Sequence, residues 1–145
     1  MHTPFSTDAE VIAIGEGVVD LTLPKPRWTH AAHFAAAVWL IREQPDIVPE
    51  RDMPALIRAY NTATGVANTD SEGYHETITQ ASLRATRAFV GSLPEGTPLF
   101  EACNLLMATD LGKRDWLLAY WSRERLFSAE ARRAWVEPDL APLPF

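Results

Sequence analysis

Hydrophobic residues recur every three or four positions over most of the chain, and this spacing predicts a protein built from α-helices. One such stripe, whose members share a helix face, is formed by Met53, Leu56, Ile57 and Tyr60. No segment alternates apolar and polar residues strictly enough to predict a half-buried strand, and no internal repeat is present. We therefore expect an all-α protein.

Prolines, glycines and capping residues divide this pattern into about six to seven helices. With their caps, the expected ranges are 7–19, 29–43, 52–65, 74–90, 97–107, 110–121 and 128–135. Thr7, Asp52 and Thr97 are expected N-caps, because their oxygens can accept from N–H groups that a helix start leaves unpaired. Gly15 and Gly17 weaken the first helix, because glycine has low helix propensity.

The segment 29–43 is apolar on nearly every side, which is typical of a helix at the centre of a domain. The segment 136–145 holds three prolines and predicts an extended tail, packed over the surface as a strap or presented to a partner. Residues 1–145 are therefore expected to form a single-domain helical bundle with an extended Pro-rich C-terminal tail.

The composition is that of an ordinary globular chain: 145 residues, 47% hydrophobic and 22% charged. A net charge of −6 disfavours binding to nucleic acid or to an anionic membrane. The longest apolar stretch, 31–41, is too short to span a membrane and no secretory signal is recognisable, so we expect a cytoplasmic protein. Cys103 is the only cysteine, which excludes a disulfide within the chain and predicts a small buried side chain.

Three of the four histidines fall in two short words near expected helix starts: Trp28-Thr29-His30-Ala31-Ala32-His33 and Gly73-Tyr74-His75-Glu76-Thr77. His30 and His33 are three residues apart and share a helix face, and His75 leads a second apolar stripe. If the two helix starts lie side by side, three imidazoles meet between the second and fourth helices. Three interpretations of this arrangement remain open.

The first interpretation is a small metal-dependent hydrolase. His30, His33 and His75 would hold zinc or a similar divalent ion with one coordination position open, as in catalytic metal sites. Glu76 would be a fourth ligand or the general base toward a metal-bound water. This is our first expectation for the function, although the sequence does not decide whether the chain is an enzyme.

The second interpretation needs no metal, because helix N-termini with nearby polar side chains favour small anions. The domain would then bind a small anionic metabolite, such as a carboxylate or phosphate, beside the histidines. The other side chains expected to contact it are Asn61, Asn68, Thr69, Tyr74 and Thr77.

The third interpretation is structural, because histidines at helix starts can cap backbone groups or bind a packed loop. An interaction protein belongs with this interpretation. Such a protein would form a homodimer through its Pro-rich tail or through the aromatic segment that carries Trp116, Tyr120 and Trp121.

Three words resemble those of a group of uncharacterised bacterial all-helical proteins: Trp28-Thr29-His30-x-x-His33, Tyr60-Asn61-x-x-x-Gly65-x-x-Asn68-Thr69 and Gly73-Tyr74-His75-Glu76-Thr77. This resemblance implies that the words belong to one fold, and it implies no activity. The three-histidine arrangement is also loosely similar to DinB-like metal-dependent bundles. That family usually places two ligands four residues apart on a late helix, and this chain has no His-x-x-x-His, so only the architecture carries over.

Overall fold

A computed structural model describes residues 3–145, and His2, the fourth histidine, lies outside them. Within this range the chain is all-α and has no strand, as the spacing predicts. The α-helices are α1 (Asp8–Val19), α2 (His30–Glu43), α3 (Pro49–Ala63), α4 (Glu76–Ser92), α5 (Leu99–Met107), α6 (Arg123–Leu126) and α7 (Ala129–Arg133). Short 3₁₀ turns are η1 (Lys25–Arg27), η2 (Asp110–Gly112) and η3 (Trp116–Ala119). Among the described residues, no helix combines the length and apolar character needed to cross a membrane.

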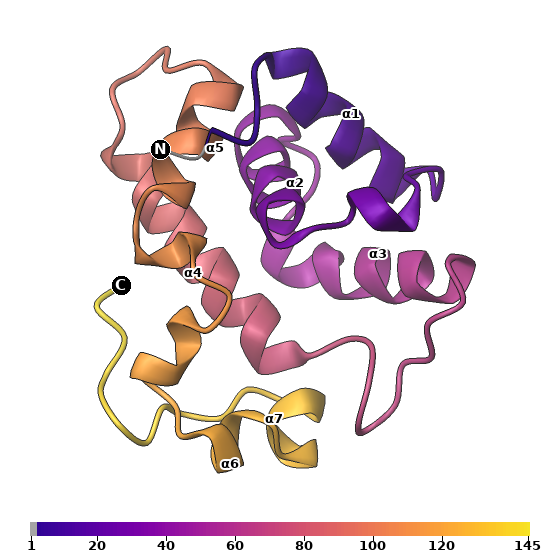
Figure 1. Cartoon of the computed structure of the whole chain (residues 1–145), viewed down its shortest axis with the longest axis vertical. Coiled ribbons are helices and arrows are strands. Elements are labelled where there is room, and N and C mark those ends of the chain that lie inside the picture. The colour runs from indigo at the N-terminus through magenta and orange to yellow at the C-terminus, as the bar shows by residue number, and fades with distance from the viewer. Residues whose placement is uncertain (1–2) are drawn as a thin grey trace.

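Helix α2 is the core helix that its apolar sequence predicts. It contacts α1, α3, α4 and α5, and every residue from Ala32 to Leu40 except His33 is buried. A helix packed on several sides must be apolar on several sides, which explains its composition. In Figure 1, α1 and α2 lie at the top, α4 crosses the middle, and α6 and α7 lie at the bottom.

Two glycines let α1 pack closely against its neighbours. A Cβ atom on Gly15 would lie 2.1 Å from Cε3 of Trp39 in α2. A Cβ atom on Gly17 would lie 2.9 Å from Cβ of Leu23. The glycines lower helix propensity, as expected, but they permit the close packing that holds α1 in place.

Helix α3 begins earlier than the sequence predicts. Asp52 is not its N-cap: the helix starts at Pro49, and the Asp52 carboxylate reaches back to accept from the N–H of Val48 at 2.9 Å. Proline suits the first helical position because the N–H there has no partner within the helix. The capping expectation therefore identified the right carboxylate but placed the N-cap four residues too late, at Asp52 instead of Val48.

Pro54, inside α3, leaves one backbone carbonyl of this helix free to bind α4. Proline has no N–H, so the carbonyl of Glu50 loses its partner within the helix. That carbonyl instead accepts from Nε2 of Gln80 at 3.0 Å. The Glu50 carboxylate accepts from Nε and Nη2 of Arg87 at 2.8 and 2.7 Å, so one residue of α3 binds α4 through both its backbone and its side chain.

Helix α5 differs from the prediction at its start. Thr97 is not a cap, because its hydroxyl donates to the Pro94 carbonyl at 2.7 Å and the helix begins at Leu99. Farther along α5, Cys103 is buried as predicted, and burial raises the pKa of its thiol to about 12.

The prediction of one helix over 110–121 is wrong. The segment forms η2 and η3, separated at Lys113, whose backbone is extended at φ −84° and ψ 134°. The chain turns tightly at Gly112, where a Cβ atom would lie 1.9 Å from the carbonyl oxygen of Met107. Trp116 lies in η3 and Trp121 follows it, and both indoles are buried despite the broken helix.

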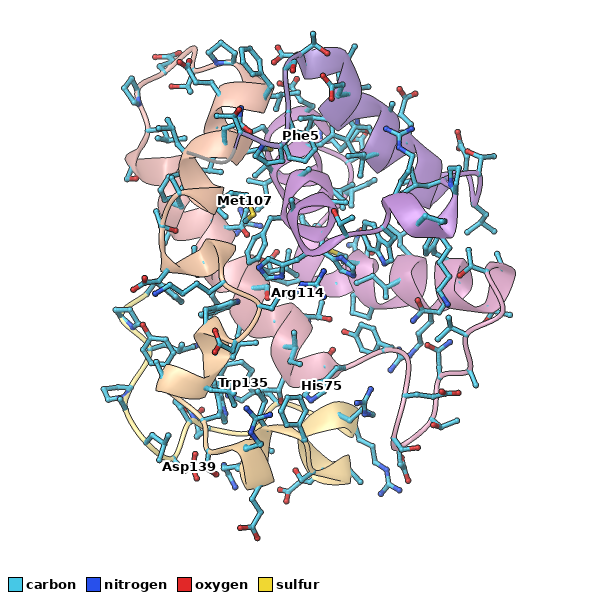
Figure 2. All side chains as sticks on the ribbon, in the orientation of Figure 1. Phe5, His75, Met107, Arg114, Trp135 and Asp139 are labelled. Atoms are coloured by element: carbon cyan, nitrogen blue, oxygen red, sulfur yellow. The ribbon has the colours of Figure 1, made fainter. Side chains whose placement is uncertain are left out.

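The segment 136–145 is extended, as its prolines predict, and it packs over the domain as a strap. Nε1 of the buried Trp121 donates to the carbonyl of Val136 at 3.0 Å. The Asp139 carboxylate accepts from the N–H of Ser122 at 2.7 Å and from its hydroxyl at 2.6 Å. Figure 2 shows Asp139 at the bottom of the molecule, on the part of the chain that follows α7.

Candidate ligand-binding cavity

A cavity of about 590 Å³ lies between α2 and α4, the helices between which the sequence placed its candidate site. Side chains of α3, of the segment around η3 and of α6 close its other sides. Small-molecule sites in proteins occupy roughly 300–1,000 Å³, so the cavity has room for a ligand of that class. Its walls are mainly apolar and include Phe34, Met53, Leu83, Trp116 and Phe127.

Two arginines border this cavity, and neither forms an ion pair within residues 3–145. The Arg114 side chain is exposed and also forms no hydrogen bond there, and in the view of Figure 2 its label lies over the region between α2 and α4. The Arg123 guanidinium lies over the ring of Phe127, 5.9 Å from its centroid. Among the described residues, Asp115 is the only acidic side chain of the lining. Two positive charges and one negative charge leave the wall with one net positive charge when its histidines are neutral.

His33 borders the cavity on an exposed position of α2. Its Nδ1 donates to the carbonyl oxygen of Thr29 at 2.7 Å, and its ring stacks on Trp28 with the centroids 3.7 Å apart. Desolvation lowers the pKa of His33 to about 4, and the hydrogen bond to Thr29 acts in the opposite direction. His33 is therefore neutral at neutral pH, with its proton on Nδ1 and a lone pair on Nε2.

His30 borders the same cavity and is held in a similar way. Its Nε2 donates to the carbonyl oxygen of Leu111 at 2.8 Å, and its ring meets Phe34 edge-on with the centroids 5.3 Å apart. The neutral ring then carries its lone pair on Nδ1. Both histidines of the first word thus use one nitrogen to bind a backbone carbonyl and keep the other free.

His75 has a different role, because it is the N-cap of α4. Its Nδ1 accepts from the N–H of Ile78 at 3.2 Å, and its Nε2 donates to the carbonyl of Leu126 at 2.7 Å. Both ring nitrogens are occupied, and burial lowers the pKa of His75. The residue is not part of the cavity lining, and Figure 2 shows it at the start of α4, below Arg114. For His75 the third interpretation applies: the histidine caps a helix and binds a backbone carbonyl.

The three histidines do not form one ligand set. Within residues 3–145, no group of three or more His, Cys, Asp and Glu side chains is placed to hold a metal ion. His30 and His33 each keep a free nitrogen, whereas His75 would have to give up its cap to bind an ion. Metal binding stays a prediction, which elemental analysis of protein purified without a histidine tag would test.

Glu76, expected as a general base, contacts Tyr74 instead of a histidine. It lies in the first turn of α4, and its carboxylate accepts from the Tyr74 hydroxyl. Burial, followed by this hydrogen bond to Glu76, raises the pKa of Tyr74. The Arg58 guanidinium lies over the Tyr74 ring, 4.3 Å from its centroid. Neither Glu76 nor Tyr74 belongs to the cavity lining.

The remaining expected ligand contacts hold the loop between α3 and α4 and the start of α4. Nδ2 of Asn61 donates to Oδ1 of Asn68 at 3.0 Å, and the Thr69 hydroxyl accepts from two backbone N–H groups of its own turn, both at 3.2 Å. The Thr77 hydroxyl donates to the carbonyl of Ala134 at 3.0 Å. These side chains stabilise the loop and the contact with the segment after α7, and they do not line the cavity.

Sequence reasoning placed His30 and His33 at the cavity but missed Arg114 and Arg123. Arg114 lies between two 3₁₀ turns, where no hydrophobic period indicates which way a side chain points. Arg123 opens a four-residue helix that is too short for a periodic signal. The one hint was a charged run, Lys113-Arg114-Asp115, directly before Trp116.

The fold and the cavity define a single-domain all-α protein with a mainly apolar pocket that opens to the surface beside two arginines. Comparison with protein-family models, with curated proteins and with solved structures finds no match to this chain. The resemblance to uncharacterised bacterial proteins stays a prediction. The chemistry of the cavity is therefore the basis for the proposed function.

Proposed function

We propose that this domain binds a small organic anion with an apolar body in the cavity between α2 and α4. The observation that carries the proposal is the Arg114 guanidinium, unpaired within residues 3–145, at the wall of an apolar cavity of about 590 Å³. A guanidinium presents a planar fork of N–H donors that matches a carboxylate. The proposal develops the second interpretation of the sequence.

Arginine, and not histidine, is the group assigned to the anion. His33 donates its N–H to Thr29, and its low pKa leaves the other nitrogen as a lone pair that repels negative charge. Arg114 and Arg123 supply the positively charged N–H donors of the lining. The anion therefore lies on the arginine side of the cavity, with Asp115 as the local charge that opposes it.

The apolar walls determine the rest of the ligand. Aromatic and aliphatic side chains such as Phe34, Met53 and Leu83 would bury an apolar body and gain roughly 25 cal/mol for each Å² removed from water. A fully hydrophilic anion such as free phosphate would gain nothing from these walls. An aromatic or aliphatic carboxylate uses both features of the cavity.

This proposal concerns binding and assigns no reaction. The metal-dependent hydrolase, the homodimer and the cytoplasmic location stay predictions from the sequence, and no contact described above depends on them.

A thermal-shift screen tests the proposal with acids and matched alcohols: phenylacetate, naphthoate and indoleacetate against phenethyl alcohol, naphthylmethanol and tryptophol. We expect the acids to raise the melting temperature more than the alcohols, because ligand binding to the folded state stabilises it. Arg114→Gln should weaken acid binding about tenfold or more, the usual cost of a lost charge-assisted hydrogen bond.

The matched control is Arg27→Gln, which removes the same charge from an exposed arginine outside the cavity lining. This variant should bind the acids as the wild type does. Equal acid binding by wild type and Arg114→Gln, or no binding of any acid by the wild type, contradicts the proposal.

A further inference from the structure

We infer that the ligand is a carboxylic acid that also carries an O–H or N–H donor, and that Nε2 of His33 accepts a hydrogen bond from this donor. The inference rests on the proposed function and names its ligand class more closely. It stands on one juxtaposition: a free guanidinium and an imidazole with a fixed tautomer face the same apolar cavity.

The tautomer follows from the partner of Nδ1. A carbonyl oxygen can only accept, so the 2.7 Å contact with Thr29 places the proton of His33 on Nδ1. Nε2 then holds a lone pair, and no side chain or backbone group within residues 3–145 donates to it. Stacking on Trp28 holds the ring in the orientation that keeps Nδ1 against the Thr29 carbonyl.

Desolvation is the main reason that His33 stays neutral, because it lowers the pKa of the ring to about 4. The hydrogen bond to Thr29 opposes this shift, and the interaction with His30, one helical turn earlier on α2, adds to it. Arg114 and Arg123 border the same cavity, and Asp115 is the acidic residue of its lining among residues 3–145.

His30 offers a second acceptor of the same kind. Its Nε2–H is held by Leu111, which leaves Nδ1 unprotonated in the neutral ring. Within residues 3–145 the only buried side-chain nitrogen or oxygen without a partner is Nε of Arg132, so Nδ1 of the half-buried His30 is open to solvent. The cavity thus combines donors for an anion at its arginines with acceptors at its histidines, and a ligand with both groups satisfies them.

Calorimetric titration of the full chain with two ligand pairs tests the inference. The pairs are para-hydroxyphenylacetate with phenylacetate, and indoleacetate with N-methylindoleacetate, and each pair differs in one donor. We expect the wild type to bind the donor-bearing acid about five- to tenfold more tightly, the usual effect of one neutral hydrogen bond. In His33→Phe, which keeps an aromatic ring for Trp28 to stack on, this preference should disappear.

Comparing the affinities of the two acids of a pair within each protein separates the donor inference from the proposed function. Equal affinities within both pairs in the wild type, with binding still dependent on Arg114, overturn the donor inference and leave the proposed function standing. A preference that persists in His33→Phe also overturns it. If no acid of either pair binds the wild type, the proposed function itself fails.

A second readout does not depend on the stability of a variant. The ¹⁵N resonances of the His33 ring report which nitrogen carries the proton. We expect the protonated Nδ1 form before ligand is added, and a change at Nε2 on addition of para-hydroxyphenylacetate that phenylacetate does not produce. A proton on Nε2 in the free protein contradicts the inference.

Discussion

At the scale of single residues, the histidines differ in what their second ring nitrogen does. His75 uses one nitrogen to cap α4 and the other to join it to the end of α6, so its loss removes two contacts at a buried position. His30 and His33 use one nitrogen each, keep the other free of protein partners within residues 3–145, and border a cavity. Histidines near two helix starts therefore have different roles: His75 is structural, whereas His30 and His33 are candidate ligand contacts.

The role of His75 predicts a stability effect. His75→Ala should lower the free energy of unfolding by about 2–3 kcal/mol, because it removes an N-cap and leaves the Leu126 carbonyl without its donor. His75→Asn restores a capping oxygen and should recover about 1 kcal/mol of this loss. Urea denaturation measures both values. Unchanged stability of His75→Ala would show that the cap contributes nothing.

The low pKa of His33 predicts a pH dependence with a defined sign. Its folded value of about 4 lies below the ordinary value of 6.5, so the unfolded chain binds the proton more readily. The stability linked to this histidine is complete above about pH 6.5 and is lost as the pH falls toward about 4. The pKa of His75 is also lowered, so it acts in the same direction. Hydrogen bonds hold the pKa values of Asp70 and Asp139 below their usual range, so the stability that these carboxyls contribute is lost only at lower pH.

Urea denaturation of the wild type and of His33→Phe across this pH window measures the effect. We expect the free energy of unfolding of the wild type to decrease with falling pH, and that of His33→Phe to decrease less. Identical slopes for the two proteins would mean that His33 has an ordinary pKa in the folded state.

Some residue roles could be predicted because they are local. Thr7, Thr29 and Ser128 all cap helices, each accepting from the N–H three residues ahead, and their positions follow from the sequence alone. The place of Arg114 could not be predicted, because the cavity that it borders is lined in large part by residues of α2, α3 and α4, which are far from it in the chain.

At the scale of helices, close packing between α1 and α2 outweighs helix propensity. Gly15→Ala should lower the free energy of unfolding by about 1–3 kcal/mol, because the added Cβ would meet the Trp39 ring. Gly91→Ala is the matched control, since no atom lies within 4 Å of its added Cβ, and it should stabilise α4 by roughly 0.5–1 kcal/mol. Thermal or urea unfolding measures both. A stabilising Gly15→Ala would contradict the packing described for α1.

The spacing of apolar residues predicts some helices correctly and fails for one segment. It identified α2 because a long helix buried on all sides is apolar throughout. It failed over 110–121, because the spacing of Trp116, Leu117 and Trp121 fits a helix, whereas the close approach of Gly112 to α5 breaks the segment into turns. That contact joins residues only five positions apart, but it depends on a glycine turn and not on the spacing of apolar residues.

At the scale of the whole molecule, the cavity is a product of assembly. Its lining comes from segments on both sides of the long loop that separates α3 from α4, and its two arginines follow α5. The sequence suggested the pair of helices, and two of its nine expected site residues, His30 and His33, border the cavity. The other seven stabilise the α3–α4 loop, the start of α4 and the contacts with α6 and the segment after α7, because their polar groups bind nearby backbone and side-chain partners.

The account depends on Arg114 binding the anionic group of a ligand inside this cavity. Isothermal titration calorimetry of the wild type, Arg114→Gln and Arg27→Gln with para-hydroxyphenylacetate measures this most directly. The account predicts saturable binding by the wild type and by Arg27→Gln, and affinity about tenfold or more weaker for Arg114→Gln. Equal affinity of all three proteins for this acid would contradict it.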